Sequence, residues 1–386
     1  MNGRLIIMGS GETGPGLVAT HRAGIQAARA ERVVVIDTPF GFQENAAQLS
    51  EKLVTFFQTS LNVPADVAGL RSRDADVADR ERALDAIRRA KYVFAGPGSP
   101  SYALEVWAAM DMSAALHRVI SGGGTVTFAS AAALTLGRTT IPVYEIYKVG
   151  APPFWLDGLD LMTELGLPCS VVPHWNNAEG GNHDTSRCYI GERRLGRLRD
   201  ELRVGLLGVD EHTAAVLDFG EGTLAAVGRG GVTLRGDDDW VIPCGSTVEL
   251  GAVAIHLGAP EAPEALPAPP EPEEVGFAQA MRSGDADGLL IALLETEERA
   301  QDDPAARAAL RSMLVQLVSA AEIGLADPRT LISGFVDVIV ELRRQARDGG
   351  DYATADQIRS DLERLGIEVR DTRTGATWTM RGKADG

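Results

Sequence analysis

Four short apolar runs, each ended by turn residues, constrain the fold of this chain most. They span residues 5–8, 33–36, 92–95 and 125–129, and each leads through small or polar residues into an amphipathic stretch. Strands that are apolar on both faces and alternate with helices are typical of a parallel sheet covered on both sides. Ligands of such sheets collect at the carboxyl ends of the strands. We therefore predict an α/β domain whose functional residues lie in these turns.

The pattern changes after about residue 200. Short apolar runs separated by glycine and aspartate follow, at residues 205–209, 214–219, 224–228, 232–235 and 246–250. They predict an antiparallel extension that completes a first domain at about residue 260. Residues 261–275, rich in Pro and Glu, predict an extended linker. A helical segment (276–324) and a small, mainly helical C-terminal module (325–386) are expected beyond it.

Composition bounds the setting of the chain and its partners. There is no apolar stretch of about eighteen residues and no basic, apolar leader, so neither a membrane span nor a signal peptide is expected. Three cysteines without paired spacing indicate a reduced, cytoplasmic setting. The net charge of −17 argues against broad nucleic-acid binding. Because much of the acidity lies in residues 261–304, a local nucleic-acid contact of the C-terminal part stays open.

The turn at Ser130 has the pattern of a nucleophile elbow. A serine nucleophile in an α/β sheet sits on a sharp strand-to-helix turn among small residues, and here three alanines follow Ser130. The amides of Ala131 and Gly98 are candidate donors to an oxyanion. An ordinary helix cap is the alternative interpretation of Ser130.

Downstream residues supply a candidate base and acid. His174 follows the apolar residues 171–173, at the end of a predicted strand, where a general base is commonly placed. Glu145 is a candidate for orienting the imidazole and stabilising its cation. A structural histidine in a loop and a solvated carboxylate are the alternatives.

These features together resemble the dipeptidase E and cyanophycinase family over residues 1–255. The resemblance rests on the sheet pattern, the Gly96-Pro97-Gly98 loop, the Ser130 turn and Pro173-His174-Trp175. It implies a class I glutamine amidotransferase-like fold and a serine hydrolase that cleaves peptide bonds next to an acidic residue. It also implies Ser130 as nucleophile, His174 as base and Glu145 as acid. Phe128 and Ala132 stand where the family has glycines, which leaves open a binding protein without catalysis.

Polar loops near these residues are candidates for binding substrate. The predicted residues are Gly11, Glu12, Asn176, Asn177, Glu179, His183, Asp184, Arg187, Glu211 and His212. Arg187 is suited to bind a substrate carboxylate, and Glu211 and His212 are expected to orient the residues that contact the substrate. A metal bound by His174, Glu179, His183, Asp184 and His212 is the alternative, but no compact ligand motif is present.

The glycine loop at residues 9–14 also fits a dinucleotide-binding pattern, with Asp37 ending the next strand. Glu12 would place negative charge beside a pyrophosphate, and a strand end needs glycine simply to turn. We therefore predict an active-site loop, with neither cofactor nor metal.

The C-terminal residues resemble the end of cysteinyl-tRNA synthetases over about 325–381. An arginine-rich helix is followed by Ala355-Asp356-Gln357-Ile358-Arg359, then by Leu365-Gly366-Ile367 and a closing Gly375-Ala376-Thr377-Trp378. The catalytic part of a synthetase is absent from the sequence, so aminoacylation is not expected. The resemblance implies a possible tRNA contact, with a protein-interaction role as the alternative.

Two hypotheses of function follow. The first is a cytoplasmic serine hydrolase acting on a small peptide or amide through Ser130, His174 and Glu145. The second is an inactive amidotransferase-like binding protein whose C-terminal module contacts tRNA or a protein. The sequence specifies neither the substrate nor an oligomeric state.

Overall fold

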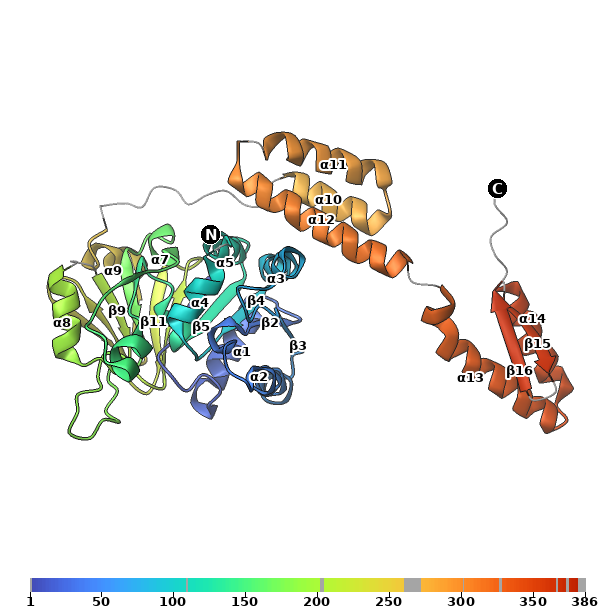
Figure 1. The fold of residues 1–386 in the computed structure, drawn as a ribbon, viewed down its shortest axis with the longest axis horizontal. Helices are drawn as coiled ribbons and strands as arrows, with labels where there is room; N and C mark the ends of the chain where they lie inside the picture. Colours follow the sequence, from blue (N-terminus) through green and yellow to red (C-terminus); the bar gives the residue numbers. More distant parts are fainter. Residues whose placement is uncertain are drawn as a thin grey trace. The chain divides into compact units, whose positions relative to one another are not determined.

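The computed structural model describes residues 2–108, 110–201, 205–259, 272–300, 302–325, 328–365, 367–372 and 375–380. Its internal contacts divide the chain into two compact units, residues 1–313 and 314–386 (Figure 1).

Five parallel strands form the centre of the first unit. They are β1 (Arg4–Met8), β2 (Val33–Ile36), β3 (Ala65–Val67), β4 (Tyr92–Ala95) and β5 (Thr125–Ala129), and they lie side by side in the order β1-β5-β4-β2-β3. The predicted parallel sheet is therefore confirmed. The sequence did not predict β3, because it is short and only one of its three residues is buried.

Side chains alternate along these strands between two apolar layers. Ile6 and Met8 pack into a cluster with residues of α1 (Val18–Ala27) and α2 (Ala46–Leu61). Leu5 and Ile7 pack into the other cluster, with α3 (Val77–Arg89), α4 (Pro100–Trp107) and α5 (Met112–Ser121). Figure 1 shows these helices around the sheet. Both faces are thus covered, which accounts for strands that are apolar throughout.

The strands after residue 200 divide between two sheets. β10 (Thr213–Asp218), β11 (Thr223–Gly228) and β14 (Thr247–Glu249) extend the first sheet antiparallel to β1. β8 (Cys169–Val172), β9 (Gly205–Val209), β12 (Gly231–Arg235) and β13 (Asp239–Pro243) form a second, four-stranded sheet.

The predicted antiparallel extension is confirmed for most of these pairings, but β9 pairs antiparallel with β12 on one side and parallel with β8 on the other. Leu206, Leu207 and Val209 are all buried. A strand covered on both faces in this way is typical of parallel pairing.

Shorter elements complete the α/β part of the first unit. They are η1 (Pro15–Leu17), η2 (Thr38–Phe40), α6 (Ala131–Leu134), β6 (Thr139–Thr140), η3 (Glu145–Val149), β7 (Leu156–Asp157), α7 (Leu161–Glu164), α8 (Glu192–Glu201) and α9 (Leu250–His256). Of these, α6 and the π-helix η3 line the candidate site.

A helical segment follows: α10 (Pro272–Ser283), α11 (Ala286–Arg299) and α12 (Pro304–Leu325). Most of the predicted linker, 261–275, lies outside the described residues, and its last four residues begin α10. The segment contacts the α/β part through polar pairs. Arg311 Nη1 donates to Glu81 Oε1 at 3.0 Å, and Ser312 donates to Asp85 of α3.

The second unit includes α13 (Pro328–Asp348), α14 (Tyr352–Arg364) and a hairpin of β15 (Ile367–Thr372) and β16 (Gly375–Met380). Its core gathers Val336, Val340, Leu362, Ile367 and Val369. The predicted module is helical as expected up to residue 364 and then ends in this hairpin. Among the described helices of the whole chain, none is long and apolar enough to cross a membrane.

Candidate active site

Ser130 occupies a sharp turn between β5 and α6. Its backbone has φ 52° and ψ −122°, and its amide donates to the Met8 carbonyl of β1 at 3.1 Å. This conformation is costly for a residue with a Cβ, and such strain persists where the surrounding structure enforces it, often at functional sites. The turn therefore has the geometry expected of a nucleophile elbow.

The two residues that replace the family glycines are accommodated by the core. Phe128 is fully buried, with its ring centroid 6.4 Å from that of Trp107. Ala132 is also fully buried, and its amide donates to the Gly96 carbonyl at 3.3 Å. Neither side chain displaces Ser130, because both belong to the apolar layer beneath the turn.

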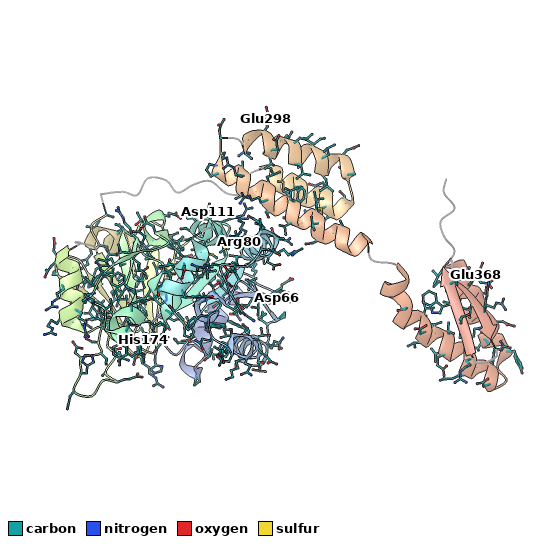
Figure 2. All side chains as sticks on the ribbon, viewed as in Figure 1. Asp66, Arg80, Asp111, His174, Glu298 and Glu368 are labelled. Carbon is teal, nitrogen blue, oxygen red and sulfur yellow. The ribbon has the colours of Figure 1, made fainter. Side chains whose placement is uncertain are left out.

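His174 lies within hydrogen-bond distance of Ser130, with 2.9 Å between His174 Nε2 and Ser130 Oγ. His174 follows β8 and has φ 49°, and the amide of the next residue, Trp175, donates to the Val209 carbonyl at 3.0 Å. This bond fixes the loop against the end of β9. His174, labelled in Figure 2, is mostly buried.

Glu211 lies on the other side of the imidazole ring, with its Oε1 3.1 Å from His174 Nδ1. Asn177 Nδ2 donates to the same oxygen at 2.7 Å, and the Glu211 amide donates to Asn176 Oδ1 at 2.8 Å. Burial acts to raise the pKa of the Glu211 carboxyl, but the hydrogen bonds from Asn177 and His174 outweigh it and lower that pKa.

The proton positions follow from these partners. An ionised carboxylate only accepts hydrogen bonds, so Nδ1 of a neutral His174 carries the proton that faces Glu211. Nε2 is then free to accept from the Ser130 hydroxyl. This is the tautomer that a general base acting on Ser130 requires.

Glu145 does not occupy the position predicted for it. Its carboxylate accepts a hydrogen bond from Ser101 Oγ at 2.5 Å, and the carboxylate beside His174 is that of Glu211. The expectation rested on the spacing of Glu145 from Ser130 along the chain. The feature of the sequence that could have identified Glu211 is its position two residues after the strand 205–209, at the predicted carboxyl edge of the sheet.

A cavity of about 440 Å³ opens beside Ser130. Gly98 and Ala131 both line it. Ala131 is the first residue of α6, where an amide has no partner within the helix. Gly98 has φ 151°, and a Cβ there would lie 1.9 Å from the Pro39 carbonyl oxygen, so only glycine fits. The predicted pair of oxyanion donors is thus located at the cavity.

The other predicted substrate residues have diverse surroundings. Glu179 lines the cavity, whereas Asn176 and Asn177 hold Glu211. The His183 ring stacks on Tyr147, with 6.3 Å between centroids.

The glycine loop at residues 9–14 packs against the turn that carries Glu211. The His212 amide donates to Ser10 Oγ at 3.0 Å, and a Cβ on Gly11 would lie 2.4 Å from His212 Nδ1. The Glu12 carbonyl accepts from the ring of buried His21 at 2.8 Å. The contacts of this loop therefore support the turn of Glu211.

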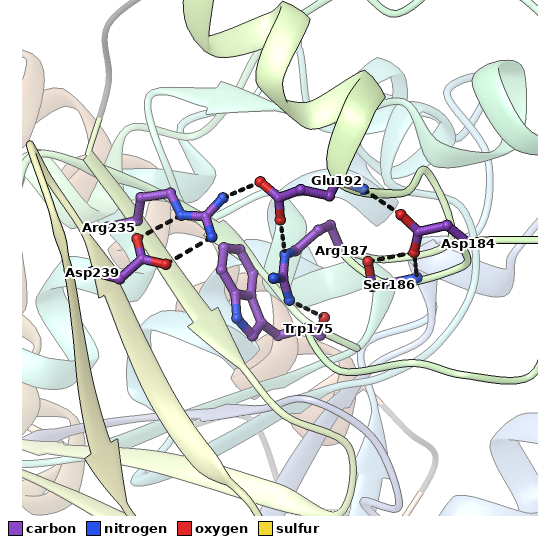
Figure 3. A network of polar contacts seen from close by, with 7 residues as sticks. All are labelled: Trp175, Asp184, Ser186, Arg187, Glu192, Arg235 and Asp239. Atoms are coloured by element: carbon purple, nitrogen blue, oxygen red, sulfur yellow. Dashed lines mark hydrogen bonds and ion pairs between the residues drawn. The ribbon is translucent and has the colours of Figure 1, made fainter.

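Arg187 takes part in a network of hydrogen bonds and ion pairs and does not line the cavity of Ser130 (Figure 3). Its Nε donates to Glu192 at 2.6 Å, its Nη1 donates to the Trp175 carbonyl at 2.8 Å, and its guanidinium lies 4.0 Å from the Trp175 ring centroid. Arg235 binds the same Glu192, and Asp184 accepts from the Glu192 amide. The network fixes the loop 184–192, and the expectation that Arg187 binds a substrate carboxylate is not met.

This loop brings strained backbone to the cavity. Arg187, Cys188 and Tyr189 have φ of 57°, 56° and 68°, and the last two line the cavity of Ser130. Burial, with the carboxylates of Glu179 and Glu211, raises the pKa of Tyr189 to about 12. Left-handed backbone costs about 1–2 kcal/mol per residue, so three in succession require the support that the network provides. Within the described part of the chain, no three His, Cys, Asp or Glu side chains gather as they would around a metal ion.

Comparison with solved structures supports the α/β part. The crystal structure of a peptidase from an acI-B1 Actinobacterium superposes with a TM-score of 0.53 and 20% sequence identity. The match covers 64% of this chain and 97% of the peptidase chain. The two proteins therefore share a fold, as the predicted resemblance to dipeptidase E implied.

Comparison with families supports the C-terminal resemblance. The family model of the cysteinyl-tRNA ligase anticodon binding domain matches residues 332–378. The cysteine–tRNA ligase of Chlorobaculum tepidum is 52% identical over 44 residues, which are 11% of this chain and 9% of the ligase. That of Salinibacter ruber is 48% identical over 61 residues, 16% of this chain and 11% of the ligase. The chain thus spans about a tenth of the length of these ligases.

Proposed function

We propose that this protein is a serine hydrolase that cleaves a peptide or amide bond. Ser130 is the nucleophile, His174 is the general base and Glu211 is the acid that orients the imidazole. The observation that carries the proposal is the continuous series of hydrogen bonds from Ser130 Oγ through both ring nitrogens of His174 to Glu211.

The first half of the reaction forms an acyl-enzyme. Ser130 Oγ attacks the carbonyl carbon while His174 Nε2 accepts the hydroxyl proton, and the carboxylate of Glu211 stabilises the imidazolium. The amides of Gly98 and Ala131 stabilise the oxyanion. The tetrahedral intermediate collapses when His174 returns the proton to the leaving nitrogen, which departs as an amine.

Water completes the cycle. His174 accepts a proton from a water molecule as the oxygen of that water attacks the acyl carbon. It then protonates Ser130 Oγ as the ester bond breaks. The products are a carboxylic acid and an amine, and the enzyme returns to its starting state.

The geometry favours this function over an inactive binding protein. A serine that only caps a helix has no need of left-handed backbone, nor of a histidine at 2.9 Å whose other nitrogen faces a carboxylate. Strain of this kind is usually retained where it positions a reacting group.

Labelling with a fluorophosphonate, followed by mass spectrometry of the peptides, tests the proposal. We expect one adduct on Ser130 of the full-length protein and none in Ser130→Ala. Ser101→Ala is the control, because the Ser101 hydroxyl donates to the carboxylate of Glu145, whereas that of Ser130 lies against a histidine. Absence of a Ser130 adduct in correctly folded wild type would refute the hydrolase.

We also propose that the C-terminal module contacts tRNA. The match of residues 332–378 to an anticodon binding domain supports this. Several arginines there are engaged in ion pairs, such as Arg344 with Glu341 and Arg359 with Glu363, so phosphate contacts would have to compete with them.

Binding of unfractionated tRNA to the full-length protein, measured across a range of salt concentrations, tests the contact. We expect binding at low ionic strength that weakens as salt rises, and a lower affinity for Arg344→Glu with Arg359→Glu. Arg32→Glu with Arg82→Glu, in the first unit, is the control with the same change in net charge. No binding at low salt would contradict the proposal.

A further inference from the structure

A second cavity, of about 620 Å³, adjoins the cavity of Ser130. The two share Tyr144 and Lys148 as lining residues. Gly98 lines the cavity of Ser130, and its neighbour Ser99 lines the second one. The second cavity, called here the side cavity, therefore lies next to the cavity in which a scissile carbonyl would lie.

Apolar groups form much of the wall of the side cavity, beside polar side chains such as those of Ser99, Glu105 and Glu145. The rings of Phe42 and Tyr102 pack with 5.3 Å between centroids, and the Tyr102 hydroxyl donates to the Arg71 carbonyl at 2.6 Å. Phe42 is 49% exposed and Val149 is 80% exposed. Large apolar side chains left exposed around a hollow of this size are typical of a site for an apolar ligand group.

The π-helix η3 carries residues to both cavities. Tyr144 and Lys148 line both, whereas Glu145 and Val149 line only the side cavity. π-Helical turns are rare and occur frequently at functional sites. The π-helix at the two cavities is therefore consistent with a binding role for its residues.

Charge argues against an acidic occupant. The charged residues that line the two cavities are Glu105, Glu145 and Glu179 against the single cation of Lys148. Glu105 is ion-paired with Arg73, but Glu145 and Glu179 would still repel a substrate carboxylate, because like charges repel most strongly in partly buried sites. Arg187, which suited a carboxylate, is bound to Glu192.

We propose that the side cavity binds a neutral, apolar side chain of the substrate, of the size of a benzyl or isobutyl group. The proposal rests on the serine hydrolase function at Ser130. Substrates with such a group on one side of the scissile bond are cleaved faster than those with a small or an acidic group at the same position.

Activated esters provide the test. Two matched pairs are compared with full-length protein, each pair differing only by a benzyl group in place of a methyl group, on the acyl side in one and on the leaving-group side in the other. We expect kcat/KM to favour benzyl about tenfold or more in one pair, as hydrophobic pockets discriminate by such factors. A carboxymethyl group at the same position is expected to be the poorest.

Two variants connect the preference with the cavity. Phe42→Ala and Val149→Ser are expected to reduce the benzyl-to-methyl ratio to about threefold or less. Val77→Ser is the matched control, because Val77 is 65% exposed at the start of α3 and lines neither cavity. It is expected to keep the wild-type ratio.

The outcomes separate this inference from the function on which it rests. If the fluorophosphonate fails to label Ser130, the hydrolase itself is refuted. If Ser130 is labelled but neither pair favours benzyl, or the preference survives in both cavity variants, the apolar subsite is refuted and the hydrolase stands.

Discussion

Replacing Glu211 with glutamine tests the catalytic geometry most directly. The substitution keeps the size of the side chain and removes its charge, so it isolates the electrostatic support of His174. In the transition state His174 is a cation, and its Nδ1 lies 3.1 Å from Glu211 Oε1. A glutamine amide can also turn its NH₂ group towards Nδ1, which would favour the tautomer that cannot accept the Ser130 proton.

The size of the effect follows from that distance. Two unit charges 3.1 Å apart attract by about 5 kcal/mol at an effective dielectric constant of about 20, and by about 2.7 kcal/mol at about 40. The side chains of His174 and Glu211 are only 11% and 23% exposed, so water screens the pair incompletely. Because about 1.4 kcal/mol corresponds to a factor of ten in rate, we expect Glu211→Gln to slow the reaction about 10²- to 10⁴-fold.

The rate of Ser130 phosphonylation, followed by intact-protein mass spectrometry, measures the effect without a known substrate. Glu221→Gln serves as control, because Glu221 is exposed at the turn after β10, in the same region of the chain. Circular dichroism and the unfolding midpoint establish that each variant is folded. A Glu211→Gln rate within about threefold of wild type would show that Glu211 does not support His174 in this way.

Three further predictions concern neighbouring positions. Glu145→Gln is expected to slow phosphonylation less than about tenfold, because Glu145 accepts from Ser101 and has no contact with His174 in the described structure. Gly98→Ala is expected to lower the unfolding midpoint and abolish labelling, since its Cβ would meet the Pro39 carbonyl at 1.9 Å. Burial lowers the pKa of His21 to about 4, so the unfolded chain binds this proton at higher pH than the folded chain. The free energy of unfolding, from urea titrations, should fall by up to roughly 3 kcal/mol between about pH 6.5 and pH 4, and less in His21→Gln.

The sequence predicted most strands of the central sheet well, because each is a short apolar run that ends in turn residues. Residues 33–36, 92–95 and 125–129 were predicted with the bounds that the structure has. The parallel pairing of β9 with β8 was not predicted, since an apolar run such as 205–209 does not reveal which strands lie beside it. The strands at residues 367–372 and 375–380 were not predicted either, because charged and polar residues interrupt their apolar ones and leave no apolar run.

The candidate site was predictable in its nucleophile and base but not in its acid. Ser130 and His174 each follow a strand directly, and the carboxyl ends of strands converge. The acid depends on which loop lies behind the imidazole, which is a matter of tertiary packing. As glutamates, Glu145 and Glu211 could both serve as the acid. The turn between β9 and β10 brings Glu211 to His174 Nδ1.

The site is assembled where the two sheets meet, which explains the backbone strain around it. Ser130 follows β5 of the first sheet, while His174 and Glu211 follow β8 and β9 of the second. A bond between Ser130 and His174 therefore requires loops from separate sheets to turn back sharply, and both residues have positive φ. Hydrogen bonds stabilise these conformations. The Ser130 amide donates to Met8 of β1 within the first sheet, and the His212 amide, in the turn after β9 of the second sheet, donates to Ser10 in the glycine loop that follows β1. Phe128 and Ala132 are fully buried in the apolar layer beneath the elbow, so the positive φ falls on Ser130 itself, where the surrounding structure must hold it.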